Sequence, residues 1–126
     1  MDKLQFRGSF EADRYRIEVA LLILSWVEED VFYTYSPTLD LTGYGKSEMD
    51  AKDSFKITLN EFIRYANNKG TLFDELEHLG WAVNRKKRKV YAPEISQLRE
   101  DNEEYRRLEG KEGVKSETSA LELVFS

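Results

Sequence analysis

The chain has 126 residues, a formal net charge of −5 and no cysteine. Its length predicts a single domain, residues 1–126, built around one hydrophobic core. The lack of cysteine excludes disulfides, zinc–thiolate sites and cysteine nucleophiles, and the acidic balance argues against a protein that binds nucleic acid over its whole surface.

One apolar run, residues 19–24, has to be distinguished from a targeting or membrane segment. It is too short to span a bilayer, and no small-residue cleavage site follows it. The residues before it mix acids with bases, unlike a signal peptide. We therefore expect a soluble cytoplasmic protein with no membrane partner.

The first regular element is a predicted β-hairpin. Residues 1–13 show little periodicity and predict a frayed terminus or a short edge strand. From Tyr15 to Ile23 every second residue is apolar, which predicts a strand. The opposite face changes from polar to apolar along this strand, so its end should be covered on both faces. Residues 28–30 predict a turn, and residues 31–36 the returning antiparallel strand.

An amphipathic helix after a glycine-rich stretch is the clearest signal. Ser47 is suited to cap its N-terminus, and Gly70 to end it in a left-handed conformation. We interpret Gly43 and Gly45 as a tight backbone turn that brings a strand onto the helix. Apolar side chains recur at spacings of three and four and predict a face that packs on the hairpin. They are Ala51, Phe55, Leu59, Phe62, Ile63 and Ala66.

The C-terminal half predicts further sheet and helix. We expect a short helix at residues 71–79, followed by two short strands at residues 81–83 and 90–92. A charged helix at residues 94–109 and a final strand at residues 120–125 should follow. Thr71 and Asp74 are spaced as a capping box for the short helix. The predicted fold is α+β: residues 15–80 form a small antiparallel sheet with one long helix packed across it, and residues 81–126 extend the same domain.

The predicted hairpin raises the question of what covers its second face. One helix covers only one face of a sheet, whereas residues 20–24 are apolar on both faces. A patch with Leu22, Leu24 and Trp26 would be larger than a soluble monomer normally exposes. We expect the C-terminal segment and a second copy of the chain, in a homodimer, to share the cover.

Catalytic and metal-binding patterns are weak. The single histidine, His78, has Asp74 and Glu75 one helical turn away, but a catalytic zinc usually needs three protein ligands. We therefore interpret His78 as a helix-end residue. Asp40, Asp50 and Asp53 could hold magnesium in a nuclease, and we interpret them as solvated carboxylates.

A partial phosphate-loop match also occurs. Gly45-Lys46-Ser47 fits the end of a Walker loop, but Asp40 stands where that loop needs glycine. We predict a protein that has no cofactor, no metal and no enzymatic activity, with a metal-dependent nuclease as the least favoured hypothesis.

Five consecutive basic residues form the strongest charge anomaly. They are Arg85, Lys86, Lys87, Arg88 and Lys89. At a hairpin tip they could bind phosphate or an acidic protein partner, or they could simply discourage edge-to-edge strand pairing. The alternative function is therefore a nucleic-acid-binding protein that uses this basic tip, with Trp81 and Tyr91 as stacking surfaces.

One stretch of the chain consists of residues 35–45, YSPTLDLTGYG, followed by Ser47, Ala51 and the helix at Phe55. On these residues the chain resembles the HicB-like antitoxin family over roughly residues 15–70. That family places a strand hairpin, a glycine turn ahead of a serine or threonine cap, and an alanine early in the helix. The resemblance implies a protein that binds and silences a small RNA-cleaving toxin. Many members also carry a C-terminal DNA-binding domain, whereas residues 81–126 show neither a helix-turn-helix nor a ribbon-helix-helix pattern.

Overall fold

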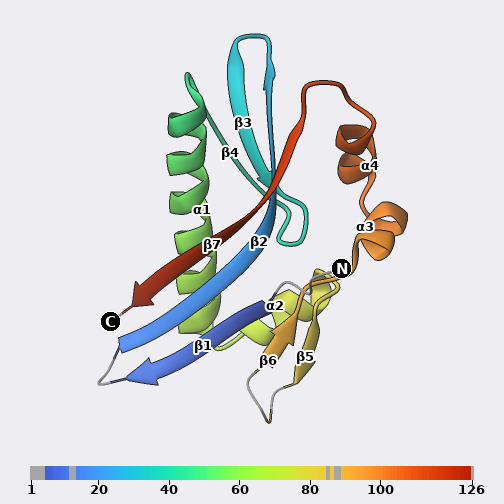
Figure 1. The fold of residues 1–126 in the computed structure, drawn as a ribbon. Helices are drawn as coiled ribbons and strands as arrows, with labels where there is room; N and C mark the ends of the chain where they lie inside the picture. The colour runs from blue at the N-terminus through green and yellow to red at the C-terminus, as the bar shows by residue number, and fades with distance from the viewer. Residues whose placement is uncertain (1–4, 12–13, 85, 87–88, 126) are drawn as a thin grey trace.

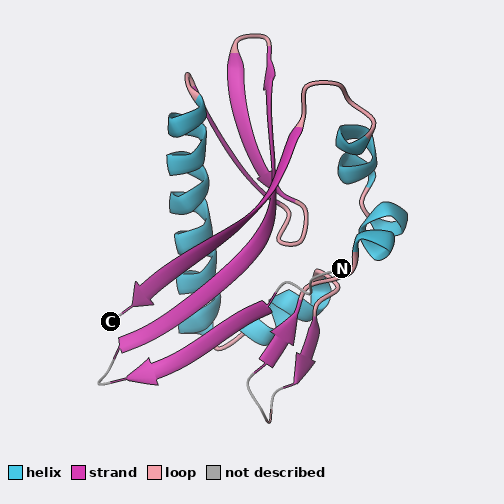
Figure 2. Ribbon diagram, viewed as in Figure 1, coloured by secondary structure: helices cyan, strands magenta, loops and turns pink. Residues whose placement is uncertain are grey.

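The computed structural model describes residues 5–11, 14–84, 86 and 89–125, and it has the α+β fold expected from the sequence (Figures 1 and 2). The strands are β1 (Gln5–Glu11), β2 (Arg14–Glu28), β3 (Val31–Ser36), β4 (Leu41–Gly45), β5 (Ala82–Asn84), β6 (Lys89–Tyr91) and β7 (Lys115–Phe125). The helices are α1 (Glu48–Lys69), α2 (Leu72–His78), α3 (Ile95–Asp101) and α4 (Glu103–Glu109). None of the helices in this part of the chain is both long and apolar enough to cross a bilayer.

The strands form one antiparallel sheet of seven strands organised around β2. Leu24 and Ser25 pair with both β3 and β7, so these two strands lie on opposite edges of β2. Residues 15–19 of β2 pair with both β1 and β7, so β1 also lies opposite β7. Strands β1 and β3 therefore occupy successive stretches of one edge of β2, and β7 runs along the other edge. The C-terminal hairpin and the final strand join the sheet of the first half, in agreement with the predicted extension of the same domain.

Strand β1 corrects part of the expectation for the N-terminus, which was a frayed end or an edge strand. It pairs with β2 through residues 6–11 and with β6 through residues 5–7, so its first residues are interior. Residues 8–11 pair on one side only among the described strands, so this stretch is an edge. The register places Phe6, Gly8 and Phe10 opposite alternate residues of β2. Glycine at the middle position interrupts the alternation of apolar residues, which explains why the sequence pattern is weak here.

Helix α1 packs on the first face of the sheet through the side chains that its periodicity predicts. Ser47 caps it by accepting a 3.0 Å hydrogen bond from the backbone N–H of Asp50, and Gly70 ends it with a φ of 71°. Phe55 is buried against Leu21 and the rest of this core. Phe62 differs from the prediction, since it lies at the margin of the core and is only half-buried.

Gly43 and Gly45 lie within strand β4 rather than in a turn, which corrects the interpretation of these glycines. A Cβ atom at Gly43 would stand 2.3 Å from the Phe55 backbone nitrogen and 2.5 Å from the Ala51 carbonyl oxygen. A Cβ at Gly45 would stand 2.5 Å from the Cβ of Asp50. Glycine is therefore required because the backbones of β4 and α1 touch, not because the chain reverses here.

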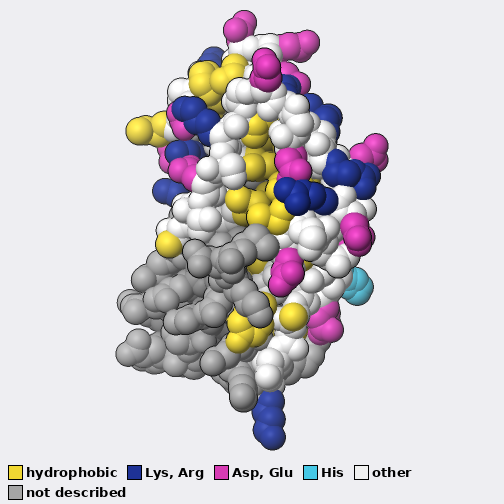
Figure 3. Space-filling model, turned by 45° about the vertical axis from the view of Figure 1, so that its right-hand side comes forward, with side chains coloured by type: hydrophobic (Ala, Val, Ile, Leu, Met, Phe, Trp, Pro, Cys, Tyr) yellow, Lys and Arg dark blue, Asp and Glu magenta, His cyan; other side chains and the backbone are white. Residues whose placement is uncertain are grey.

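The second face of the sheet is covered by α3 and α4. Leu24, Trp26 and Tyr35 form a buried cluster with Leu98 and Leu108 from these helices. The C-terminal segment of the same chain thus covers the patch from which the sequence predicted a homodimer, and that patch needs no second copy. Figure 3 shows acidic and basic side chains close together on this side of the molecule. An ion pair between α3 and α4 joins Arg99 to Glu109 at 2.8 Å.

The charged segment at 94–109 is two helices rather than one. Asn102 ends α3 and begins α4, where its side chain accepts a 2.9 Å hydrogen bond from the backbone N–H of Tyr105. Asparagine favours such a break because its side chain replaces a backbone partner at a helix end. Beyond α4, Lys111 donates a hydrogen bond to Glu28, and this bond lowers the pKa of the Glu28 carboxyl.

The short helix α2 and the β5–β6 hairpin complete the first core. Leu72 and Leu76 of α2 are buried there, whereas the expected capping box is absent because Thr71 makes no side-chain hydrogen bond to the helix end. Trp81 is 3% exposed, and its indole N–H donates a 2.6 Å hydrogen bond to the Thr38 carbonyl oxygen. This bond ties the hairpin to the loop between β3 and β4.

Candidate functional site

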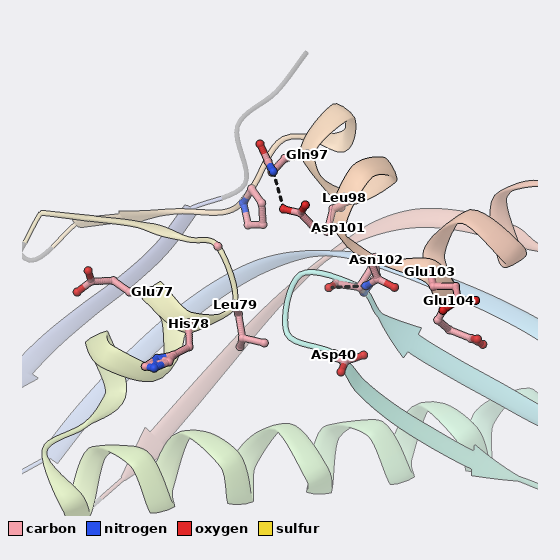
Figure 4. Close-up of a pocket in the computed structure, with 13 residues that line it drawn as sticks. Asp40, Glu77, His78, Leu79, Gln97, Leu98, Asp101, Asn102, Glu103 and Glu104 are labelled. Carbon is pink, nitrogen blue, oxygen red and sulfur yellow. Dashed lines mark hydrogen bonds between the residues drawn. The ribbon is translucent and has the colours of Figure 1, made fainter.

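A groove with acidic walls lies where three separate segments meet (Figure 4). The loop between β3 and β4, the end of α2 and the junction of α3 with α4 enclose about 450 Å³. Five carboxyl groups line it, from Asp40, Glu77, Asp101, Glu103 and Glu104, together with His78 and no lysine or arginine. We call this feature the acidic groove. Its volume suits one or two long side chains of a partner.

Hydrogen bonds hold the two walls of the acidic groove together. The Tyr35 hydroxyl donates a 2.8 Å bond to Asp40, and the Asn102 amide donates a 3.0 Å bond to the same hydroxyl. Burial raises the pKa of Tyr35 above its ordinary value, and the Asp40 carboxylate adds to this rise. The phenol therefore stays protonated and continues to donate to Asp40. Asp40 itself has a φ of 54°, a left-handed conformation that aspartate tolerates better than most residues.

The remaining acids of the groove come from the helix junction. Asp101 accepts a hydrogen bond from Gln97, one turn earlier in α3. Glu104 accepts a 2.7 Å bond from Arg107, which lowers the pKa of the Glu104 carboxyl. Figure 4 shows these side chains on α3 and α4, across the groove from Asp40. The groove therefore combines carboxylates held by hydrogen bonds with Glu103, which is exposed at the start of α4.

The structure does not gather the carboxylates that the sequence offered as a metal site. Asp40 lines the groove, whereas Asp50 and Asp53 are exposed on α1. His78 is exposed, and its Nδ1 lies 3.3 Å from the Asp74 carbonyl oxygen. Within the described ranges no three His, Cys, Asp or Glu residues are grouped so as to hold a metal ion.

The basic tip lies mostly outside the described residues, which omit Arg85, Lys87 and Arg88. Lys86 is exposed in the turn between β5 and β6, and Lys89 begins β6. Nucleic-acid binding by this tip stays a prediction. The idea that Trp81 stacks on bases is wrong, because its ring is buried and its N–H is bonded to the backbone.

Four of the groove acids, Glu77, Asp101, Glu103 and Glu104, were not singled out from the sequence. They stand in two distant segments, and nothing in their spacing distinguishes them from ordinary surface charge. Only the packing of α3 and α4 against the β3–β4 loop brings them together. Comparison with known proteins found no matching family model, no matching curated protein and no matching solved structure.

Proposed function

We propose that this chain is a non-enzymatic protein-binding module that binds and neutralises a small, basic, RNA-cleaving protein, in the manner of a HicB-type antitoxin. The acidic groove is the observation that carries the proposal. A protein that cleaves RNA must present cationic side chains to the phosphate backbone. A groove lined by carboxylates is complementary to that surface and would compete with RNA for it.

The chemistry of the groove favours arginine or lysine on the partner. A guanidinium can form paired hydrogen bonds with a carboxylate, and such charge-assisted bonds are stronger than neutral ones. Asp101 and Glu103 are exposed at the helix junction, where a long cationic side chain can reach them. The proposal places the protein in the cytoplasm, where a partner that cleaves cellular RNA would act.

Elements shared with the HicB-like pattern support the same proposal. The β2–β3 hairpin, the cap at Ser47 and a fully buried Ala51 early in α1 occur in that order along the chain. Gly43 allows β4 to touch α1, which gives this glycine a physical role in the fold. The loop that joins β3 to β4 in this pattern lines the acidic groove through Pro37 and Asp40.

An RNA-cleavage assay tests the proposal. The proposal predicts that a gene beside this one encodes a small basic protein, and that protein is the reagent. Alone, that protein should cleave RNA, and an equimolar amount of the present chain should stop the cleavage. The present chain alone, with Mg²⁺ or Mn²⁺, should cleave neither RNA nor DNA.

Three results would count against the proposal. One is a gene neighbourhood with no small basic reading frame, and another is cleavage that continues unchanged when the chain is added. The third is nuclease activity of the chain itself that disappears in Asp50→Ala, because that carboxylate belongs to the alternative nuclease hypothesis.

A further inference from the structure

Strand β7 presents a long unpaired edge. Its eleven residues pair with β2 from one end to the other, and no strand in the described part of the chain pairs with its outer edge. Backbone N–H and C=O groups along such an edge bond to water or to another strand. The other outer strands of the sheet are shorter, since β4 has five residues and β5 has three.

The β7 edge also lacks two of the usual protections against pairing, a proline and a bulge. It contains no proline, and its register with β2 is unbroken, so no bulge twists the edge away. Of its charged residues, Glu117 is held by a 3.2 Å ion pair with Lys52 of α1. By contrast, β4 is short and packed directly against α1.

We propose that β7 pairs antiparallel with β7 of a second copy of this chain, around a two-fold axis at Ala120. A second copy is the occupant that the edge itself favours, because it carries an identical unpaired edge. One symmetric contact then satisfies both edges at once and leaves none open. The sheet continues from one subunit into the other.

The charge pattern of β7 is compatible with this register. Ala120 is the midpoint of the strand, so all eleven residues of each copy pair. Lys115 then faces Phe125, Glu117 faces Leu123, and Glu122 faces Thr118 of the partner subunit. No residue faces a like charge, and the small Ala120 meets its own copy at the axis.

Most residues of β7 whose burial is described are exposed, namely residues 115–118 and 120. Helix α1 packs closely on β4 and reaches β7 through the ion pair of Lys52 with Glu117. Helices α3 and α4 cover Leu24, Trp26 and Tyr35 on the other face. Ala120 and Thr118 are both exposed in the single chain, so substitutions there can be made without disturbing its core.

Two lysine substitutions on the same face of β7 test both the interface and its register. The wild type should show a dimer mass by light scattering at micromolar concentration, and dissociate on dilution. Ala120→Lys places two lysines opposite each other, and should raise the dissociation constant on the order of tenfold or more. Thr118→Lys places each new lysine opposite Glu122 of the partner subunit, and should leave the dimer intact or tighten it.

A mixing experiment completes the test. Ala120→Lys and Ala120→Glu should each be weakened alone and should form a mixed dimer when combined. Melting temperatures close to that of the wild type at low concentration would show that the variants fold. A wild type that is monomeric at every concentration overturns the proposal, and so does an equal response of the dimer to both lysines. None of these outcomes depends on whether the acidic groove binds a partner.

Discussion

Gly43→Ala should be among the most damaging single-methyl changes in the chain. The added Cβ would meet backbone atoms of Phe55 and Ala51 at 2.3 and 2.5 Å, and backbone cannot move aside as a side chain can. We expect the free energy of unfolding to fall by about 3 kcal/mol or more, at or above the upper end for overpacked cores. Denaturant unfolding of the purified variant measures this loss.

Gly110→Ala is the matched control for this substitution. A Cβ there would have its nearest neighbour 3.9 Å away, and the residue has a helical conformation that alanine adopts without strain. Its stability should stay within about 0.5 kcal/mol of the wild type, as for most surface substitutions. Equal stability of the two variants would mean that β4 and α1 do not touch as described.

Phe55→Ala should destabilise the protein by removing the largest side chain at the centre of the α1 interface. Phe55 is 2% exposed and packs in one cluster with Leu21 and Leu59. Truncation of a buried phenylalanine costs about 3–5 kcal/mol because it removes apolar contacts and leaves a cavity. The midpoint of denaturant unfolding should shift accordingly, without a change in slope.

Two further variants calibrate this result. Ile57→Ala changes a side chain on the same helix that is 60% exposed, and it should have little effect on unfolding. Phe62→Ala should fall between the two, because Phe62 is only half-buried. A Phe55 variant as stable as the Ile57 variant would show that α1 presents a different face to the sheet.

These local features were largely predictable from the sequence. The apolar spacing that includes Phe55 and Leu59 specifies one face of a helix, and Ser47 and Gly70 specify its ends. Such signals are strong because they depend on residues close together in the chain. The role of Gly43 was less accessible. A glycine pattern alone does not distinguish a turn from a close contact between backbones.

The acidic groove and the cover of the second face could not be predicted in the same way. Both depend on how residues near 40, 77 and 101–104 meet, and no local pattern encodes that meeting. The break at Asn102 was visible only as an interruption of an apolar stripe. Its partner, Tyr35, lies 67 positions earlier in the chain. Long-range packing therefore decides the site, whereas local periodicity decides the elements that build it.

The most direct test of the proposed function is calorimetric titration of the small basic protein that the proposal predicts beside this gene into two double variants. Asp101→Lys with Glu103→Lys reverses charge inside the acidic groove, and Asp53→Lys with Glu61→Lys makes the same change on the exposed side of α1. We predict that the groove variant weakens binding at least about tenfold, because like charges then face each other, while the α1 variant binds as the wild type does. Equal affinity of the two variants would contradict the assignment of the groove as the binding site.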